Sequence, residues 1–302
     1  MVKRKPNSPE PQSIAVVTDS ASDIPEGQIK EYSITVIPFY IHYKQKEFRD
    51  GIDITSSQVY TLQKEQKAIF KSSAPSPRDF HQAYLSLLKQ YDFIISIHIS
   101  SRLSGLINSA YLARDLLGAD KRIIIYDSLA ATMGCGLMAL AAARAARQGY
   151  RLDQILDVLD YLKANIKLYG TIGTLKYLSL SGRVPALASS ISSLLGIKPM
   201  LGIRDGTVGM VGISFFRKRS INVILRKVTR HFKKERWVIV SIIHSLCLPE
   251  AELVKDKLGS RLNCVQIILT ECTPVIGAHT GPGLIGVIIS SLDYRLYRLF
   301  SR

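Results

Sequence analysis

The chain has 302 residues, and its 40 Lys or Arg residues against 24 Asp or Glu residues give a formal net charge of +16. With 47% apolar and 21% charged residues, the composition excludes a disordered protein and predicts two folded domains. No apolar run reaches the roughly 18–20 residues that cross a bilayer, and no signal-peptide pattern follows Met1, so we expect a cytoplasmic protein.

The first half of the chain alternates strand-like and helix-like segments. Residues 1–12 are rich in proline, serine and basic residues, and we expect a flexible arm there. Strands are predicted at 14–17, 34–41, 93–99 and 122–126, and helices at 77–90, 104–117, 131–147 and 152–165. This order is typical of a largely parallel sheet with crossover helices. We assign it to an N-terminal α/β domain over 13–166.

The second half has a different pattern. Strands at 198–203 and 207–216 flank the turn at 204–206, which indicates a hairpin. A basic helix at 219–235 then leads to a strand at 237–243. A helix at 249–262 and strands at 265–269 and 284–289 complete the chain. We expect a C-terminal mixed α/β domain over 167–302.

Small hydroxyl residues follow apolar strands or precede helices at three places, 18–23, 72–77 and 100–105. In open α/β sheets, ligands bind beyond the carboxyl ends of the strands. Ser104 and Gly105 precede a predicted helix, whose free N–H groups favour an anion. Each hydroxyl can either cap its own helix or donate to a carboxylate or phosphate. The sequence leaves both roles open.

His279 lies among small residues in the Gly-rich segment 277–283. A histidine there can bind an anion or move a proton near neutral pH, or it can satisfy nearby turn carbonyls. Gly281, Gly283 and Gly286 spell G-x-G-x-x-G, but a strand follows where a dinucleotide site needs a helix. No phosphate loop is present, and the cysteines lack metal-like spacing. We therefore predict no metal and no cofactor.

The segment 217–236 carries nine Lys or Arg residues interleaved with apolar ones. The simplest interpretation is the solvated face of an amphipathic helix. Contact with an anionic membrane surface is the next alternative. Nucleic-acid binding is less favoured, because no recognition motif or aromatic platform accompanies the charge.

Seven short motifs follow one another in the order that one known family has. Residues 18–23 resemble T-D-S-x-S-D, 72–76 resemble T-S-Q-P-S, and 100–105 resemble S-S-G-L-S-G. The series continues at Asp127-Ser128 with 133–136, at 181–184, at 197–199 and at 277–283. Together, from about residue 14 to residue 289, the chain resembles the DegV family, whose fatty-acid-binding members are subunits of bacterial fatty acid kinase.

This resemblance implies a two-domain α/β fold with a long-chain fatty acid buried in a tunnel. It implies that Ser72, Ser104 and His279 bind the carboxylate. The supporting loops would carry Asp19, Ser20, Ser73, Gly105, Asp127, Ser128 and Arg183. It further implies that the chain is a carrier and not an enzyme, and that a separate ATP-dependent kinase converts the bound carboxylate to an acyl phosphate.

The sequence departs from the family pattern at several of these positions. Ser72 replaces a threonine but keeps its hydroxyl, and Arg102 and Leu106 replace a glycine and a threonine. Phe215 stands where the family often has an arginine near the acid head group. Because Arg217 would share a strand face with Phe215, we expect Arg217 to substitute for that arginine.

The alternative to a fatty-acid carrier is an enzyme, namely a serine-dependent hydrolase of acyl esters. It needs Ser104 or Ser72 as nucleophile, His279 as base, and an acid that orients the histidine. Asp19 or Asp127 would be that acid. No nucleophile-elbow motif supports this alternative.

Overall fold

The N-terminal half forms a four-stranded parallel sheet. In the computed structural model, which describes residues 12–119, 121–183 and 197–301, the order is β2-β1-β6-β7. The strands are β1 (Ile14–Asp19), β2 (Thr35–Ile37), β6 (Phe93–His98) and β7 (Ile123–Asp127). β1 is buried throughout and β6 from its second residue onward, as expected for parallel strands covered on both faces.

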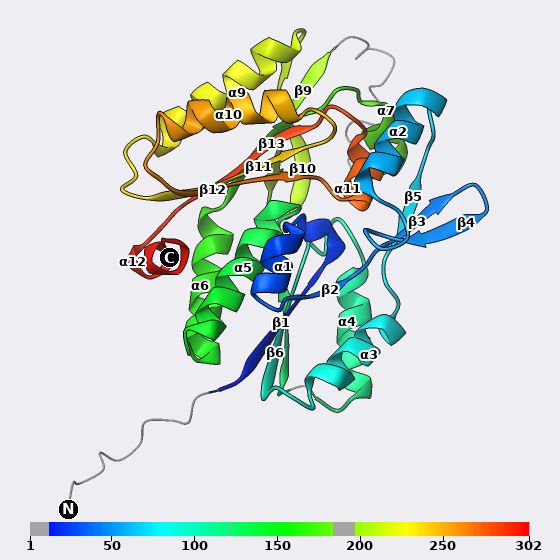
Figure 1. Cartoon of the computed structure of the whole chain (residues 1–302), viewed down its shortest axis with the longest axis vertical. Coiled ribbons are helices and arrows are strands. Elements are labelled where there is room, and N and C mark those ends of the chain that lie inside the picture. The colour runs from blue at the N-terminus through cyan, green and yellow to red at the C-terminus, as the bar shows by residue number, and fades with distance from the viewer. Residues whose placement is uncertain (1–11, 120, 184–196, 302) are drawn as a thin grey trace, which may run out of the picture.

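Helices cover both faces of this sheet (Figure 1). α3 (Pro77–Leu87) and α4 (Leu106–Leu116) pack together on one face, and α5 (Met133–Arg147) and α6 (Leu152–Asn165) lie on the other. The short elements η1 (Ser20–Ser22) and α1 (Glu26–Glu31) follow β1. The small residues of α5 let it pack closely, because a side chain at Gly136 would collide with the Ser22 carbonyl.

The C-terminal half forms a six-stranded mixed sheet in the order β10-β9-β8-β13-β11-β12. The strands are β8 (Lys167–Thr171), β9 (Lys198–Arg204), β10 (Thr207–Ser214), β11 (Val238–His244), β12 (Cys264–Glu271) and β13 (Ile285–Ser291). Only β11 and β12 pair in parallel. α9 (Arg217–Phe232) and α10 (Leu248–Gly259) cover its outer face and share a second apolar cluster with it.

A third, antiparallel sheet has the order β4-β3-β5. It contains β3 (Tyr40–Tyr43), β4 (Lys46–Arg49) and β5 (Lys71–Ser73), and α2 (Ser56–Gln66) lies between β4 and β5 in sequence. Although this segment belongs to the first half of the chain, β3, β5 and α2 contact α11 (Pro274–Thr280), which also packs on α7 (Lys176–Ser181). The C-terminal helix α12 (Tyr294–Phe300) returns to α5.

The α/β architecture confirms the predicted fold class, with two corrections. The strand predicted at 34–41 is two strands in different sheets, because Pro38 has no N–H for a ladder and interrupts the run. His279, expected in a Gly-rich turn, lies in the last turn of the helix α11; Gly281, with φ +68°, ends that helix. The predicted boundary at residue 167 coincides with the start of β8, and the division into domains stays a prediction.

Some predicted features fall outside the described residues, namely most of the basic arm and the end of the 181–184 motif. Within the described residues, no helix is both long enough and apolar enough to span a membrane.

Candidate functional site

An apolar cavity of about 140 Å³ lies between the carboxyl ends of the parallel strands and the inner face of the mixed sheet. From the parallel sheet, loops after β1, β6 and β7 contribute Ala21, Ile99, Leu103 and Ala131. The mixed sheet contributes Leu168, Leu201, Ile203, Val208 and Ile243, and Leu284 lies directly before β13. Because ligands of α/β folds bind at this edge of the sheet, the cavity is the candidate site.

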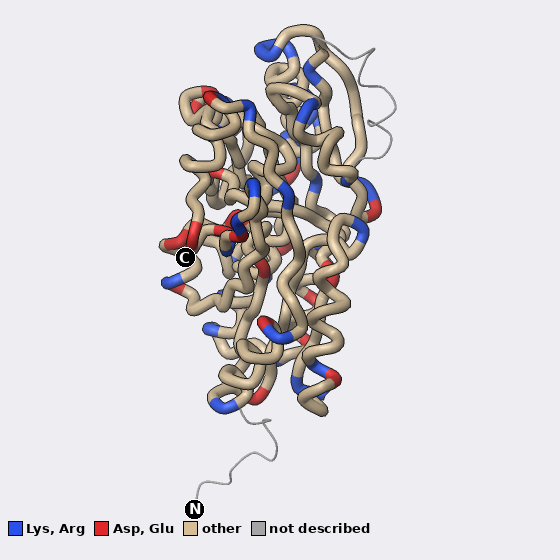
Figure 2. Tube along the Cα trace, turned by 90° about the vertical axis from the view of Figure 1, so that its right-hand side faces the viewer, with Lys and Arg blue, Asp and Glu red and all other residues tan. Residues whose placement is uncertain are grey.

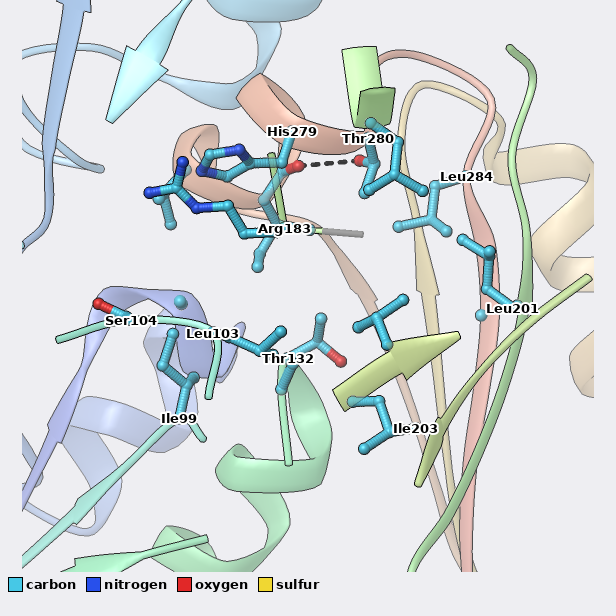
Figure 3. A pocket seen from close by; sticks show the side chains of 18 of the residues that line it. Ile99, Leu103, Ser104, Thr132, Arg183, Leu201, Ile203, His279, Thr280 and Leu284 are labelled. Atoms are coloured by element: carbon cyan, nitrogen blue, oxygen red, sulfur yellow. Dashed lines mark hydrogen bonds between the residues drawn. The ribbon is translucent and has the colours of Figure 1, made fainter. Parts of the chain in front are cut away.

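The charged and titratable side chains that line the cavity gather at one end with Ser104, whereas Thr132 and Thr280 lie farther along the cavity wall (Figure 3). His279 and Arg183 lie side by side there, with Ser104 opposite, whereas Leu201 and Ile203 lie away from them. Ser72, on β5, also lines this end, and its Oγ is 2.7 Å from Nε2 of His279. The cavity thus has a polar end and a remainder that is apolar except for Thr132 and Thr280.

Ser104 bonds to the start of its own helix and keeps a hydrogen-bond donor for a ligand. Its Oγ accepts a hydrogen bond of 3.2 Å from the N–H of Leu106 at the start of α4. The hydroxyl hydrogen is not used in that bond and can donate to a ligand. Ser104 is half-buried and lines the cavity, so its bond to the N–H of Leu106 and a bond to an anion are compatible.

His279 is neutral at physiological pH. Burial, together with the Arg183 guanidinium, lowers the pKa of His279 to about 4. The neutral ring carries one N–H. When Nε2 carries it and donates to Ser72 Oγ, the Ser72 hydroxyl hydrogen is left free for an anion.

Two buried carboxyl groups hold the helix that carries His279. Asp23 Oδ1 accepts hydrogen bonds of 2.8 Å from both the N–H and the hydroxyl of Thr273, which precedes α11. Asp50 Oδ1 accepts one of 3.1 Å from the N–H of Val275. Burial raises the pKa of Asp23 to about 8 and that of Asp50 to about 7. These groups position α11 without lining the cavity themselves.

Two further hollows adjoin the cavity. One of about 250 Å³ shares Ser72, Arg183 and His279 with it and is also lined by the exposed Lys71 and Leu180. Another of about 370 Å³ shares Leu168 and Ile203 and extends toward the hairpin turn at 204–206. The polar end therefore borders a basic surface hollow, and the apolar end borders the hairpin turn.

The other predicted loop residues shape the loops and do not line the cavity. Asp19 accepts a hydrogen bond of 3.0 Å from Nδ1 of the buried His98. Ser20 Oγ accepts from Phe39 N–H, and Ser73 bonds to His42. Gly105 is the N-cap of α4, Asp127 accepts from two backbone N–H groups, and Ser128 bonds to Ala130.

The structure corrects the expectation for Arg217. The side chain lies at the start of α9, where it forms an ion pair with Glu250 and donates to the Gly283 carbonyl at 2.6 Å. It is not among the residues that line the cavity. The prediction failed because it assumed that the strand continues, whereas β10 ends at Ser214 and the chain enters a helix. Phe215 is 64% exposed and does not line the cavity either.

Sequence reasoning missed Thr132, which also lines the cavity. Its Oγ1 is buried without a hydrogen-bond partner, and its φ of +53° is unusual for a β-branched residue. It is the N-cap of α5 but makes no side-chain cap. The helix predicted at 131–147 includes Thr132, so the sequence held no signal that distinguished this residue.

No group of three His, Cys, Asp or Glu side chains suited to a metal ion occurs in the part of the chain that the structure describes.

Comparison with known proteins identifies the family. The model of the DegV family, described as "Uncharacterised protein, DegV family", matches residues 13–292. A DegV domain-containing protein of Caldanaerobacter subterraneus is 34% identical over 278 residues, which cover 91% of this chain and 98% of that protein. One from Deinococcus radiodurans is 31% identical over 281 residues, covering 93% and 99%.

Solved structures of the same fold extend over nearly the whole chain. A DegV family protein from Thermus thermophilus, described for its fatty acid binding, has a TM-score of 0.87 at 29% identity and covers 93% of this chain and 100% of its own. DegV from Bacillus subtilis, described as a fatty acid binding protein, has a TM-score of 0.84 at 27% identity, with coverages of 93% and 100%. A stearic acid-binding protein from Eubacterium ventriosum scores 0.84 at 26% identity, with coverages of 94% and 99%. The chain therefore belongs to the DegV family.

Proposed function

We propose that this protein binds one long-chain fatty acid in the cavity and presents its carboxylate to a separate ATP-dependent kinase. The observation that carries the proposal is the division of the cavity into a polar end at Ser72, Ser104 and His279 and a mostly apolar remainder. The relatives described as fatty acid binding proteins support it.

Burial of the acyl chain supplies the affinity. Transfer of about fourteen methylenes from water to an apolar tunnel is worth on the order of 11 kcal/mol, at about 0.8 kcal/mol each. A buried, unpaired carboxylate would cost several kcal/mol of this gain. Hydrogen bonds from Ser72 and Ser104, with the Arg183 guanidinium nearby, offset that cost. The polar end thus fixes the orientation of the acid.

The basic hollow beside the polar end is where the kinase would reach the carboxylate. Lys71 and Arg183 give it positive charge, and the Ser72–His279 pair borders both this hollow and the cavity. In the proposed transfer, a carboxylate oxygen forms a bond to the γ-phosphorus of ATP while the bond from that phosphorus to ADP breaks. The products are an acyl phosphate and ADP. The carrier supplies position and charge, and the kinase supplies the nucleotide site.

The first test is native mass spectrometry of the full-length protein purified from a bacterial host. We expect a mass increment equal to one long-chain fatty acid, released by denaturation. A protein that arrives empty and gains no mass after incubation with oleate or palmitate would contradict the proposal.

Two substitutions separate binding from transfer. Ser104→Ala should weaken acid retention, because it removes a donor to the carboxylate. Ser101→Ala is its control, since Ser101 is exposed in the same loop and does not line the cavity. His279→Ala should retain the acid but lose phosphoryl transfer from kinase and ATP, with the exposed His231→Ala as control. If Ser104→Ala retains the fatty acid as well as the parent does, Ser104 is not part of the site that binds the carboxylate.

The hydrolase is a second candidate because Ser72 and His279 lie within hydrogen-bond reach at 2.7 Å. However, Asp19 bonds to His98 and Asp127 to backbone N–H groups, and no carboxylate contacts His279 within the described ranges. A pKa of about 4 also makes His279 a weak base. Turnover of a p-nitrophenyl acyl ester that disappears in Ser72→Ala would favour the hydrolase over the carrier.

A further inference from the structure

Thr132 places a buried hydroxyl group that has no hydrogen-bond partner in the wall of the cavity. The residue is 7% exposed and lines the cavity, and its Oγ1 has no partner among the described residues. Buried polar atoms in proteins are nearly always hydrogen-bonded, because an unpaired one loses its bonds to water and gains none in return. An exception in the wall of a ligand cavity marks a position where the ligand can supply the missing bond.

The helix that begins after Thr132 does not use this hydroxyl group. A threonine before a helix ordinarily accepts a hydrogen bond from the second or third N–H of that helix. Here those N–H groups, of Gly134 and Cys135, donate instead to the carbonyls of Ala131 and Thr132, each at 3.0 Å. The Thr132 side chain makes no cap. The hydroxyl group is therefore available to a ligand.

The backbone fixes the direction in which the Thr132 side chain points. The residue has a φ of +53°, which a β-branched residue adopts only where the surrounding structure holds it. One such restraint is the bond of 2.8 Å from the N–H of Ser100, in the loop after β6, to the carbonyl of Ala130. Figure 3 shows the Thr132 oxygen turned toward the side of the cavity where Leu201 and Ile203 lie. The hydroxyl group is thus held toward the mostly apolar part of the cavity.

The group that Thr132 can bind there is neutral. Among the described residues that line the cavity, the only Lys, Arg, Asp or Glu is Arg183, which lies at the polar end beside His279. The other described Lys and Arg positions are spread over the whole height of the molecule (Figure 2) and do not line the cavity. A second charge on the ligand would be buried without a counter-ion. A hydroxyl group can both donate to Thr132 and accept from it, whereas a carbon–carbon double bond offers only a weak acceptor.

We propose that the cavity accepts fatty acids that carry a hydroxyl group along the acyl chain, and that Thr132 binds this hydroxyl group. The inference rests on the proposed function and names a substrate class for it. When the carboxylate is bound at Ser72 and Ser104, only chain positions level with Thr132 bring a hydroxyl group within its reach. At other positions the hydroxyl group would lie against side chains that are apolar or already hydrogen-bonded, and it would lose its bonds to water. The position of the hydroxyl group therefore decides the affinity.

The test uses a series of hydroxystearates whose hydroxyl group moves in steps of two carbons along the acyl chain. Each competes with stearate for the full-length protein, and native mass spectrometry measures the ratio bound. Because the isomers have the same composition, they differ only in where the hydroxyl group lies. We expect the best-placed isomer to bind about tenfold more tightly than the worst-placed one, since a buried hydroxyl group without a partner costs about that much in affinity.

Substitutions at Thr132 assign the preference to its hydroxyl group. Thr132→Val replaces the hydroxyl group by a methyl group and should abolish the difference between the isomers, whereas Thr132→Ser keeps the hydroxyl group and should preserve the difference. Thr280→Val is the matched control, because Thr280 also lines the cavity but its Oγ1 donates to the Ile276 carbonyl at 2.9 Å. It should preserve the order of the isomers, whatever it does to the affinity for all of them. Thermal unfolding checks that each variant folds.

The outcomes separate this inference from the proposed function. A parent protein that binds stearate but does not distinguish the isomers contradicts the role of Thr132 and leaves fatty-acid binding intact. An order of isomers that survives in Thr132→Val also overturns the inference, as does a dependence on Thr132 that appears with oleate and not with any hydroxystearate. A protein that binds none of these acids contradicts the proposed function and, with it, the role of Thr132.

Discussion

Asp23 and Asp50 make the free energy of unfolding depend on pH, because burial keeps both carboxyl groups protonated in the folded protein. Burial raises the pKa of Asp23 to about 8 and that of Asp50 to about 7, whereas an aspartate in an unfolded chain has a pKa of about 3.9. Between these values the folded state holds a proton that the unfolded state has lost. Their contribution to stability is therefore complete below about pH 4 and falls as pH rises through the folded pKa.

Asp23→Asn removes one of these titrations while leaving the structure close to unchanged. The amide oxygen can still accept from Thr273, as Oδ1 of Asp23 does. One such group contributes a slope of about 1.4 kcal/mol per pH unit. Between about pH 5 and pH 7 the parent should therefore lose about 3 kcal/mol more unfolding free energy than Asp23→Asn. His279, whose pKa is lowered, contributes a slope of opposite sign, which is present in both proteins and cancels in the comparison.

Urea unfolding followed by circular dichroism at several pH values measures this slope. Asp53→Asn is the control, because the pKa of the exposed Asp53 is lowered to about 2 by its bonds to Arg49, so its contribution changes only in acid. We expect the unfolding free energy of Asp53→Asn to change with pH in parallel with that of the parent over this range. The unfolding free energy of Asp23→Asn should diverge from both. If the unfolding free energies of the parent, Asp23→Asn and Asp53→Asn all change with pH in parallel, the claim that the buried Asp23 is protonated would be refuted.

Four further predictions follow from the site. Thr132→Val should raise the unfolding free energy of the empty protein by about 1 kcal/mol, measured in urea, because it removes a buried hydroxyl without a partner. Leu168→Trp should shift acid preference toward shorter chains in competition mass spectrometry, because Leu168 borders the apolar end; an unchanged preference would contradict that orientation. Arg217→Met should lower stability by about 1 kcal/mol through loss of its pair with Glu250 yet leave acid retention unchanged. A bound carboxylate should raise the pKa of His279, so calorimetry in two buffers at about pH 6 should detect proton uptake on binding.

The sequence predicts the parallel sheet well because its signals are local. β1, β6 and β7 are short apolar runs followed by polar loops, and α6 has a clear apolar stripe. The small sheet was not recognised because β4 and β5 are three or four residues long and polar, and because β3 was predicted only as the end of the strand at 34–41. β3 and β5 pack on α11, which is distant in sequence and leaves no periodicity to detect.

The site was predictable only in part, for a similar reason. Ser72 and His279 are 207 residues apart, and no pattern in the chain brings them together, so their pairing came from the family resemblance. Asp23 and Asp50 were not recognised as positioning residues, because their partners on α11 are equally remote. The role expected for Arg217 depended on whether a strand continued for three more residues, and strand ends are poorly specified by local sequence.

A crystal structure of the full-length protein with its copurified or added fatty acid tests the central claim most directly. We predict that the carboxylate lies within hydrogen-bond distance of Ser72 and Ser104, and that the acyl chain runs past Thr132 toward Leu168 and Ile203. A cavity closed by side chains, or an acid bound elsewhere with its carboxylate in solvent, would contradict the account.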